Sequence, residues 1–313
     1  MDALAGLAAG FAVILTWQNI QLILIGSIVG TLIGVLPGIG PLAALSLLLP
    51  ATIALPPVAA IAMLCAIFYG SMYGGSITSI LVNIPGEAAS VVTCLDGYAM
   101  ARQGRAGAAL GIAALGSFIA GTIGIIILSV GAPLLGEFAI RLGPPEYSAL
   151  MVLGLACTIL MIQGSALKGA VMIGLGSALA AIGMDVVTGE SRFTFGTIQL
   201  TAGIELLAVV IGLFGVSEIL LNVEQSARGM AVKARLRGLW PTRDDWRASA
   251  APILRGSGIG FAIGLLPGGG PVTASFLAYA AERRLGRDPR SFGKGRIEGV
   301  AGPDAANNAA VSS

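Results

Sequence analysis

Six long apolar runs constrain the fold of this chain more than any other sequence feature. They approach or reach the roughly 17–25 residues that a helix needs to cross a bilayer, and they cover residues 22–36, 58–73, 106–130, 147–163, 169–187 and 204–221. Charged residues make up only 11% of the sequence, whereas a soluble domain carries about 25%. We therefore expect an all-α, polytopic integral membrane protein with at least six crossings and the lipid bilayer as its main solvent.

The N-terminal apolar stretch, residues 4–16, is short for a full crossing. The residues before it lack the positive region of a cleaved signal peptide. We expect this stretch to stay in the mature protein as a surface or half-crossing helix.

Positive residues gather in two segments. Seven Lys or Arg residues lie between Arg228 and Arg255, and six more lie between Arg283 and Arg296. The positive-inside rule places both segments on the cytoplasmic side of a membrane. Juxtamembrane basic loops are ordinary in membrane proteins, so we expect no nucleic-acid partner.

A duplicated segment predicts an internal structural repeat. Residues 26–47 and 256–277 are identical at twelve of 22 positions, at an offset of 230 residues. Duplicated halves with matching Gly/Pro interruptions are typical of secondary transporters. We expect a first membrane repeat over residues 1–225, a basic cytoplasmic linker over 226–255, and the incomplete start of a second repeat over 256–313.

Both copies carry the pattern Leu-Pro-Gly-Xaa-Gly-Pro, which predicts a broken helix. Proline removes a main-chain donor, and a break at membrane depth survives only where protein, water or a ligand supplies the missing partners. The helix that restarts after the break aims free N–H groups and a positive dipole end at it, which suits an anion. The candidate binding residues of the breaks are therefore Gly38, Gly40, Gly268, Gly269 and Gly270.

The geometry of the second break stays open at this level. Its apolar arms, residues 252–266 and 272–281, are each short for a crossing, and both outer flanks are basic. A re-entrant hairpin that enters from the cytoplasmic side and turns at residues 268–270 satisfies both facts. The alternative is one kinked helix that crosses the membrane.

A stripe of glycines at four-residue spacing precedes each break. Such a stripe lets another helix backbone approach closely, so we favour packing over ligand contact for its members, which are Gly26, Gly30, Gly34, Gly256, Gly260 and Gly264.

A second polar stretch begins at Tyr69. Ser76, Thr78 and Asn83 are candidate ligand groups, because buried polar groups at membrane depth need partners. The alternative for the hydroxyls is a hydrogen bond to their own helix, and the sequence leaves both open. A Pro-Gly pair then breaks the helix, and we expect an interfacial loop after it. Glu87 could couple proton or sodium movement, although a solvated or capping carboxylate is the commoner role.

Several chemistries are excluded by what the sequence lacks. The chain contains no histidine, which excludes Ser-His-Asp hydrolysis and His-ligated zinc. The Gly-Lys pair at residues 293–294 lacks the spacing of a phosphate-binding loop. The three cysteines of the chain are widely spaced in apolar surroundings, and we expect them to be packing residues. We therefore expect neither an enzyme nor a cofactor, apart from a coupling cation.

Six stretches together resemble the large membrane subunit, or permease, of the tripartite tricarboxylate transporters. They read GVLPGIGP at 34–41, YGGSITSILVNIPGEAASVVTCLDGYAMARQGRAG at 73–107, GPPEYSAL at 143–150, DVVTGESRFTFG at 185–196, GLLPGGGP at 264–271 and EGVAGPDAANNAA at 298–310. They follow the family's order along nearly the whole chain. The family continues past the Asn-Asn segment into further helices with a second Ile-Pro-Gly break, so we expect this chain, which stops at Ser313, to be C-terminally truncated.

The resemblance implies a multi-pass secondary transporter subunit in a bacterial inner membrane. It implies two partners, a small membrane subunit and a periplasmic solute-binding protein, and a di- or tricarboxylate as cargo. In this reading the two breaks meet near the bilayer midplane, where Ser76, Thr78, Asn307 and Asn308 help to hold the carboxylate or the coupling cation. Arg102 and Arg105 are weaker candidates. The alternative function is a membrane scaffold or sensor that docks a binding protein without transport.

Overall fold

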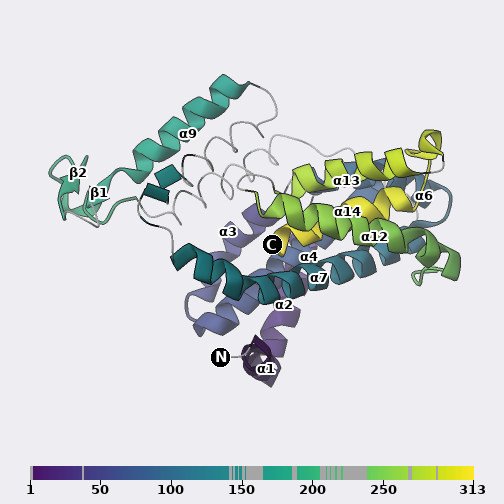
Figure 1. The fold of residues 1–313 in the computed structure, drawn as a ribbon, viewed down its shortest axis with the longest axis horizontal. Helices are drawn as coiled ribbons and strands as arrows, with labels where there is room; N and C mark the ends of the chain where they lie inside the picture. The colour runs from purple at the N-terminus through teal and green to yellow at the C-terminus, as the bar shows by residue number, and fades with distance from the viewer. Residues whose placement is uncertain are drawn as a thin grey trace.

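A computed structural model of the chain shows an almost entirely helical protein (Figure 1). The structure describes residues 3–36, 39–140, 165–184, 189–204, 238–266, 270–286 and 288–313, together with scattered residues between 143 and 152 and between 209 and 220. The predicted runs 147–163 and 204–221 therefore lie largely outside the described residues.

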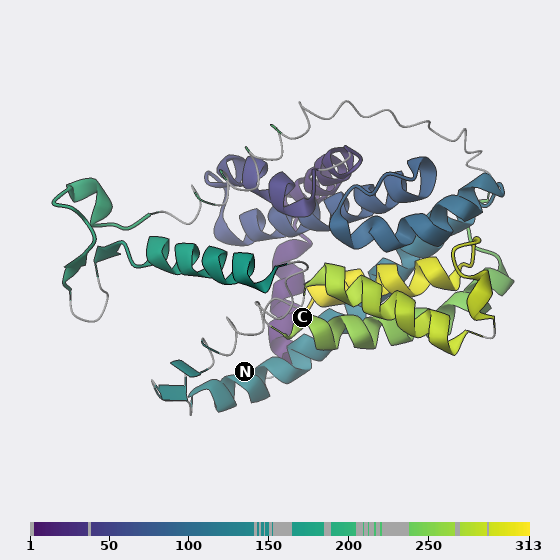
Figure 2. The ribbon, with the colours of Figure 1, turned by 90° about the horizontal axis from the view of Figure 1, so that it is seen from above.

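The first part of the chain contains the helices α1 (Ala3–Ile14), α2 (Trp17–Gly34), α3 (Pro41–Thr52), α4 (Pro57–Val82) and α7 (Ala106–Ile140). Between α4 and α7 lie the short helical segments η1 (Ala88–Ser90), α5 (Val91–Thr93), η2 (Cys94–Tyr98) and α6 (Ala99–Arg102). The later part contains α9 (Ala166–Ala180), the strands β1 (Gly183–Met184) and β2 (Ser191–Arg192), η3 (Ile198–Leu200), α12 (Arg243–Gly264), α13 (Pro271–Leu285), η5 (Pro289–Ser291) and α14 (Glu298–Val311). In both views α9 and the small β hairpin lie at one end of the molecule, away from α14 (Figure 2).

Three described helices are long and apolar enough to cross a membrane. They are α2, α4 and the part of α7 that ends at Gly131, and they correspond to the first three predicted runs. The all-α, polytopic fold class is thereby confirmed. Helix α1 has the predicted short length. Helix α9 ends at Ala180, just before the turn into the β hairpin, so it is shorter than the run over 169–187.

The glycine stripes pack helix against helix, as predicted. A Cβ added at Gly26 would lie 2.7 Å from the carbonyl oxygen of Met63, and Gly30 and Gly34 abut Ile67 and Ser71 in the same way. These contacts advance together along both chains, so α2 and α4 run parallel with their backbones in close approach.

The second copy repeats this arrangement. Gly256, Gly260 and Gly264 of α12 lie against the backbone of Gly302, Ala306 and Ala310 of α14, so α12 and α14 also run parallel. The two similar sequence segments therefore also pack in the same way. In each copy, the helix before the break lies against the second helix after the break.

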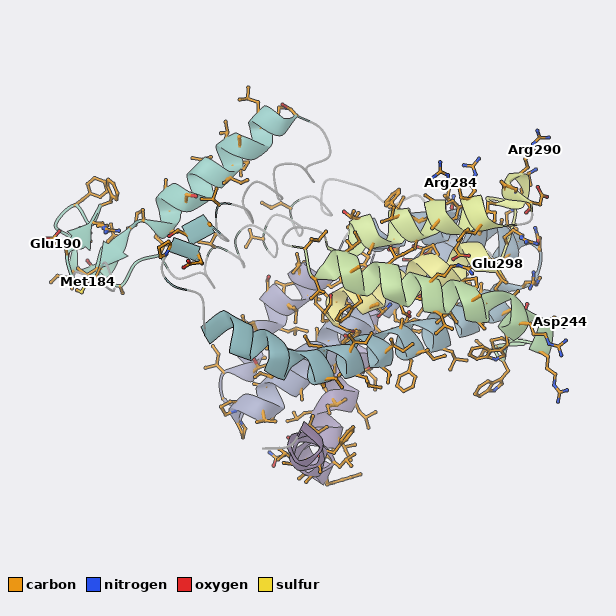
Figure 3. The ribbon with its side chains drawn as sticks, viewed as in Figure 1. Met184, Glu190, Asp244, Arg284, Arg290 and Glu298 are labelled. Carbon is orange, nitrogen blue, oxygen red and sulfur yellow. The ribbon has the colours of Figure 1, made fainter. Side chains whose placement is uncertain are left out.

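The chain folds back at the second break. Arg255 and Glu282 lie at similar distances in sequence before and after it, and their side chains form an ion pair with N···O 2.6 Å. One kinked helix would hold these residues far apart, because each helical residue adds 1.5 Å along the axis. Asp244 and Arg284, from the outer ends of α12 and α13, accordingly lie at the same end of the molecule (Figure 3). The fold-back expected of a hairpin is confirmed, whereas its entry from the cytoplasmic side and its turn at membrane depth stay predictions.

The two copies run in opposite directions. Ser76 of α4 bonds Asp304 of α14, and Tyr69 bonds Ser312, so α4 and α14 are antiparallel. Helix α14 lies among α4, α7 and α12, and its buried Val300, Ala301, Ala305 and Ala309 belong to the main apolar core. Opposite directions in two similar halves are the arrangement called inverted repeats.

Helix α12 begins earlier than the sequence indicates. Thr242 caps it, because its side chain accepts from the N–H of Asp245 while Asp245 bonds the N–H of Thr242 in return. The helix therefore runs through residue 255, where we expected the basic linker to end, and the described part of that linker is largely helical.

Candidate functional site

The two breaks meet at one cavity of about 490 Å³. Gly40 and Pro41, at the start of α3, form one part of its wall, and Pro271 and Val272, at the start of α13, form another. The loop after α4, with Glu87, completes the site together with Phe68 and neighbouring residues. Segments 230 residues apart in sequence thus face one space.

The N-termini of two helices lie at the wall of this cavity. Pro41 and Pro271 occupy the first helical positions of α3 and α13, where the absent N–H would have no partner in any case. The next N–H groups of each first turn have no acceptor within the helix. Gly270 has a positive φ of 25°, a value that favours glycine. This arrangement suits an anion.

The break after α4 has its own local cause. Asn83 ends α4 in the left-handed conformation with φ 59°, and the Pro-Gly pair that follows prevents the helix from resuming. Glu87 then caps η1, where Ser90 bonds the main chain of Glu87. The Glu87 carboxylate also accepts a hydrogen bond from Nδ2 of Asn307 at 3.2 Å. Glu87 is therefore partly buried at the cavity wall and tied to α14.

A second carboxylate, Asp304, lies beneath this wall and is 2% exposed. Oγ of Ser76 donates to one of its oxygens at 2.7 Å, and Oγ of Ser117 donates to the other at 2.8 Å. Nδ2 of Asn308 donates to Oγ of Ser117 at 2.8 Å and also to the carbonyl oxygen of Asp304. Three helices therefore meet at one buried acid.

A second cavity of about 380 Å³ adjoins this network. Residues of α2, α4, α7 and α14 line it, among them Ser117, Asn308, Tyr69 and Tyr73. Ser117 and Asn308 thus connect the Asp304 network to a space separate from the cavity at the breaks.

The predicted site residues fall into three groups. Gly40 lines the first cavity, and Gly270 directly precedes Pro271, which also lines it. Ser76, Asn307 and Asn308 belong to the polar network beside this cavity. Thr78 bonds the carbonyl oxygen of Gly75 in its own helix, and Asn83 is an exposed helix cap. Gly38, Gly268 and Gly269 lie outside the described residues. A role in ligand binding stays a prediction for all of them.

We expected an interfacial loop after Glu87, and this prediction is wrong for the later part of the segment. Asp96 lies in the π-helical turn η2 and is fully buried. Its carboxylate accepts hydrogen bonds from the N–H groups of Gly293, Gly295 and Arg296 and from the hydroxyl of Tyr279. A buried carboxylate is tolerated when several hydrogen-bond donors surround it. Asp96 therefore has a structural role, because its hydrogen bonds join the two copies.

The basic residues near this turn have structural partners. Arg105 forms an ion pair with Asp245, which joins the start of α7 to the start of α12. Arg102 is exposed and lines a shallow depression with Gln103 and Lys294. Neither arginine lines the cavity at the breaks.

Sequence reasoning missed Asp304 and Ser117. One signal was available for Asp304, because it precedes Asn307 and Asn308 by three and four residues, a spacing that puts all three on neighbouring positions of one helix. Ser117 has no such signal, since it is one small residue in the long apolar run of α7.

Comparison with known proteins gives a consistent result. The family model of the tripartite tricarboxylate transporter TctA family matches residues 20–313. An uncharacterized 52.8 kDa protein of the TAR-I ttuC' 3' region of Agrobacterium vitis is 49% identical over 312 residues, which are 99% of this chain and 62% of that protein. An uncharacterized protein of the TAR-II ttuC' 3' region of the same organism is 58% identical over 52 residues, 17% of this chain and 22% of that protein. No solved structure matches.

Proposed function

Because this chain belongs to the tripartite tricarboxylate transporter TctA family, a family of transporter components, we propose that it carries a small di- or tricarboxylate across a bacterial inner membrane. In this proposal it is the large membrane subunit of a secondary transporter. It works with a small membrane subunit and with a periplasmic solute-binding protein that delivers the carboxylate.

One observation carries the proposal: the N-terminal ends of α3 and α13 line the same cavity. Each end offers unpaired N–H groups and the positive end of a helix dipole. Discontinuous helices whose N-terminal ends face an anionic substrate are a recurring design in secondary transporters. The cavity volume of about 490 Å³ lies within the range of small-molecule sites.

The charges around the cavity also fit a carrier better than a permanent binding site. No Lys or Arg is among the described residues that line it, and Glu87 is the one charged side chain there. Main-chain groups alone would therefore hold the carboxylate. Such contacts are weaker than those of an arginine clamp, which favours release of the cargo on the far side.

The principal test is uptake into proteoliposomes. The full-length protein would be reconstituted with its small membrane subunit and binding protein, and radiolabelled citrate would serve as a representative tricarboxylate. We expect saturable uptake that needs the binding protein and responds to an imposed ion gradient. A scaffold or sensor would give no flux under any gradient, and a passive channel would give flux that does not saturate.

Filling the cavity at the first break should reduce this uptake. A Cβ at Gly40 would lie 3.9 Å from Cβ of Glu87, an ordinary contact, and the φ of Gly40 is −72°, so the backbone tolerates a side chain. Gly40→Leu should therefore fold. It should lower uptake roughly tenfold or more, because a carboxylate would then overpack the cavity at a cost of about 1–3 kcal/mol.

Gly258→Leu is the matched control. Gly258 lies in α12 with no neighbouring atom within 4 Å of an added Cβ, so uptake should stay at the wild-type rate. Wild-type uptake by a folded Gly40→Leu protein would remove the cavity from the mechanism.

A further inference from the structure

Asp304 is a buried acid that has no positive partner in the part of the chain that the structure describes. It is 2% exposed, and its carboxylate oxygens receive hydrogen bonds from two neutral hydroxyls, those of Ser76 and Ser117. Transfer of an ionised carboxylate into such surroundings is costly unless a cation neutralises it. Intramembrane acids of this kind commonly mark the path of an ion.

A second observation also favours a proton or cation beside these acids. Asn307 is 1% exposed, and its Oδ1 has no hydrogen-bond partner among the described residues. The same amide donates from Nδ2 to Glu87, so the unpartnered oxygen lies beside a carboxylate. Acceptors therefore outnumber donors around Glu87 and Asn307, and a buried acceptor without a donor costs about 1–3 kcal/mol.

The described groups that face Asp304 supply no positive charge that would compensate it. The titratable groups among them are Glu87 and Tyr73, neither of which supplies a positive charge. Helix α7 contributes the neutral Ser117.

On α12 and α13, Arg255 and Glu282 neutralise each other in an ion pair. Asp96, against the first turn of α14, has its own main-chain donors.

The distances favour a proton over a metal cation at Asp304. Both serine oxygens contact the carboxylate directly, at 2.7 and 2.8 Å, which are hydrogen-bond lengths between oxygens. A proton on the carboxyl group needs no coordination shell, so this arrangement can hold it without opening the contact.

The two acids also lie between two spaces. Glu87 lines the cavity at the breaks, whereas Ser117 and Asn308, which hold Asp304, line the cavity among α2, α4 and α7. The Ser117 hydroxyl therefore lies between the second cavity and Asp304, where it can pass a proton to the carboxylate. A carboxylate in the first cavity lies beside Glu87, which repels it whenever Glu87 is ionised.

We infer that Asp304 and Glu87 form a proton-binding pair that couples carboxylate binding at the breaks to proton movement. The inference rests on the proposed transport function. Protonation neutralises the pair and so permits an anion at the breaks, and departure of the anion then favours loss of the proton. Asp304 holds the proton away from the substrate, while Glu87 lies beside it.

The first test does not depend on transport. Infrared spectra of the purified full-length protein at neutral pH should contain the carbonyl band of a protonated carboxylic acid. Asp304→Asn should weaken that band, and Asp244→Asn, which alters an exposed acid at the start of α12, should not. Ser117→Ala keeps the acid but removes one hydrogen bond, so the band should shift without being lost. An unchanged band in folded Asp304→Asn protein would overturn the proposal.

The second test measures coupling. Wild-type proteoliposomes should accumulate radiolabelled citrate in response to a pH gradient, and Asp304→Asn and Glu87→Gln should lose that accumulation. Asp304→Asn, which leaves the lining of the cavity at the breaks unchanged, should keep exchange of labelled for unlabelled citrate. Asp244→Asn should behave as the wild type. Accumulation driven by a sodium gradient alone would overturn the inference and leave the transport function intact. Absence of all citrate flux in the wild type would contradict the function itself.

Discussion

Asp245 joins the start of α12 to the start of α7 through one carboxylate. It accepts hydrogen bonds from the main chain and the hydroxyl of Thr242 at 3.0 and 2.8 Å, and it forms the ion pair with Arg105. Burial disfavours its ionisation, but the hydrogen bonds from Thr242 and the charge of Arg105 outweigh burial and lower the pKa of Asp245 below its usual value. The ionised form is therefore the one that stabilises the start of α12.

Replacement of this residue should weaken the protein in a pH-dependent way. A carboxylate with a lowered pKa contributes stability above its unfolded pKa of about 3.9, and loses that contribution as the pH falls through the folded value. Asp245→Asn should cost about 1 kcal/mol at neutral pH, given the partial exposure of Arg105. Melting curves in detergent should show a difference from the wild type that shrinks progressively as the pH falls below about 4.

Asp244→Asn is the comparison for this experiment. Asp244 is the preceding residue, and its side chain is 93% exposed, so its replacement should leave the melting temperature nearly unchanged. A destabilisation by Asp245→Asn that stayed the same at every pH would contradict the role given to its charge.

The hydroxyls of α4 show a limit of sequence reasoning at this scale. Ser76 and Thr78 have similar surroundings in the sequence, yet Ser76 bonds Asp304 and Thr78 bonds its own helix. The partner of Ser76 lies 228 residues away, so nothing local distinguishes the two. Sequence reasoning could name both as candidates but could not choose between them.

At the scale of elements, the glycine stripes are the strongest feature that the sequence allowed us to predict. Their four-residue spacing is local, and its physical meaning, close approach of two backbones, needs no knowledge of the partner. The fold-back at the second break is different. The ion pair of Arg255 with Glu282 reveals it, whereas the sequence leaves the hairpin and the kinked helix as two alternatives.

A side chain in the stripe should separate the paired helices. A Cβ at Gly260 would overlap the backbone of Ala306, which cannot move away without displacing α14. Gly260→Leu should destabilise the protein by roughly 3 kcal/mol, seen as loss of the monodisperse peak in gel filtration and a lower melting temperature.

Gly258→Leu again provides the matched comparison, two residues away on the same helix and facing open space. Leucine has a better helix propensity than glycine by about 1 kcal/mol, so this variant should melt at or slightly above the wild-type temperature. Equal effects of the two variants would show that α12 and α14 do not depend on close contact.

The whole molecule consists of two similar halves that run in opposite directions. Helix α2 is parallel to α4, α12 is parallel to α14, and α4 and α14 are antiparallel, so α2 and α12 must start on opposite sides. The repeat itself was visible in the sequence. Its inversion was not, because only the contacts of α4 with α14 reveal it.

This arrangement predicts the membrane topology. The basic outer ends of α12 and α13 should lie in the cytoplasm, so the start of α2 should face the periplasm. A cysteine placed at Thr16, in a cysteine-free background, should react with a membrane-impermeant maleimide in intact cells. A cysteine at Arg243 should react only after permeabilisation, and labelling of both sites in intact cells would exclude the inverted arrangement.

The hydrogen bonds of Asp96 have a consequence for the synthesis and folding of this protein. Its main-chain donors lie about 200 residues further along the chain, and a ribosome adds roughly 5 to 20 residues per second. For about 10 to 40 s of synthesis, the Asp96 carboxylate of the first half therefore lacks the main-chain donors that it has in the described structure. Folding of the first half is therefore completed only after residues 293–296 have been synthesised.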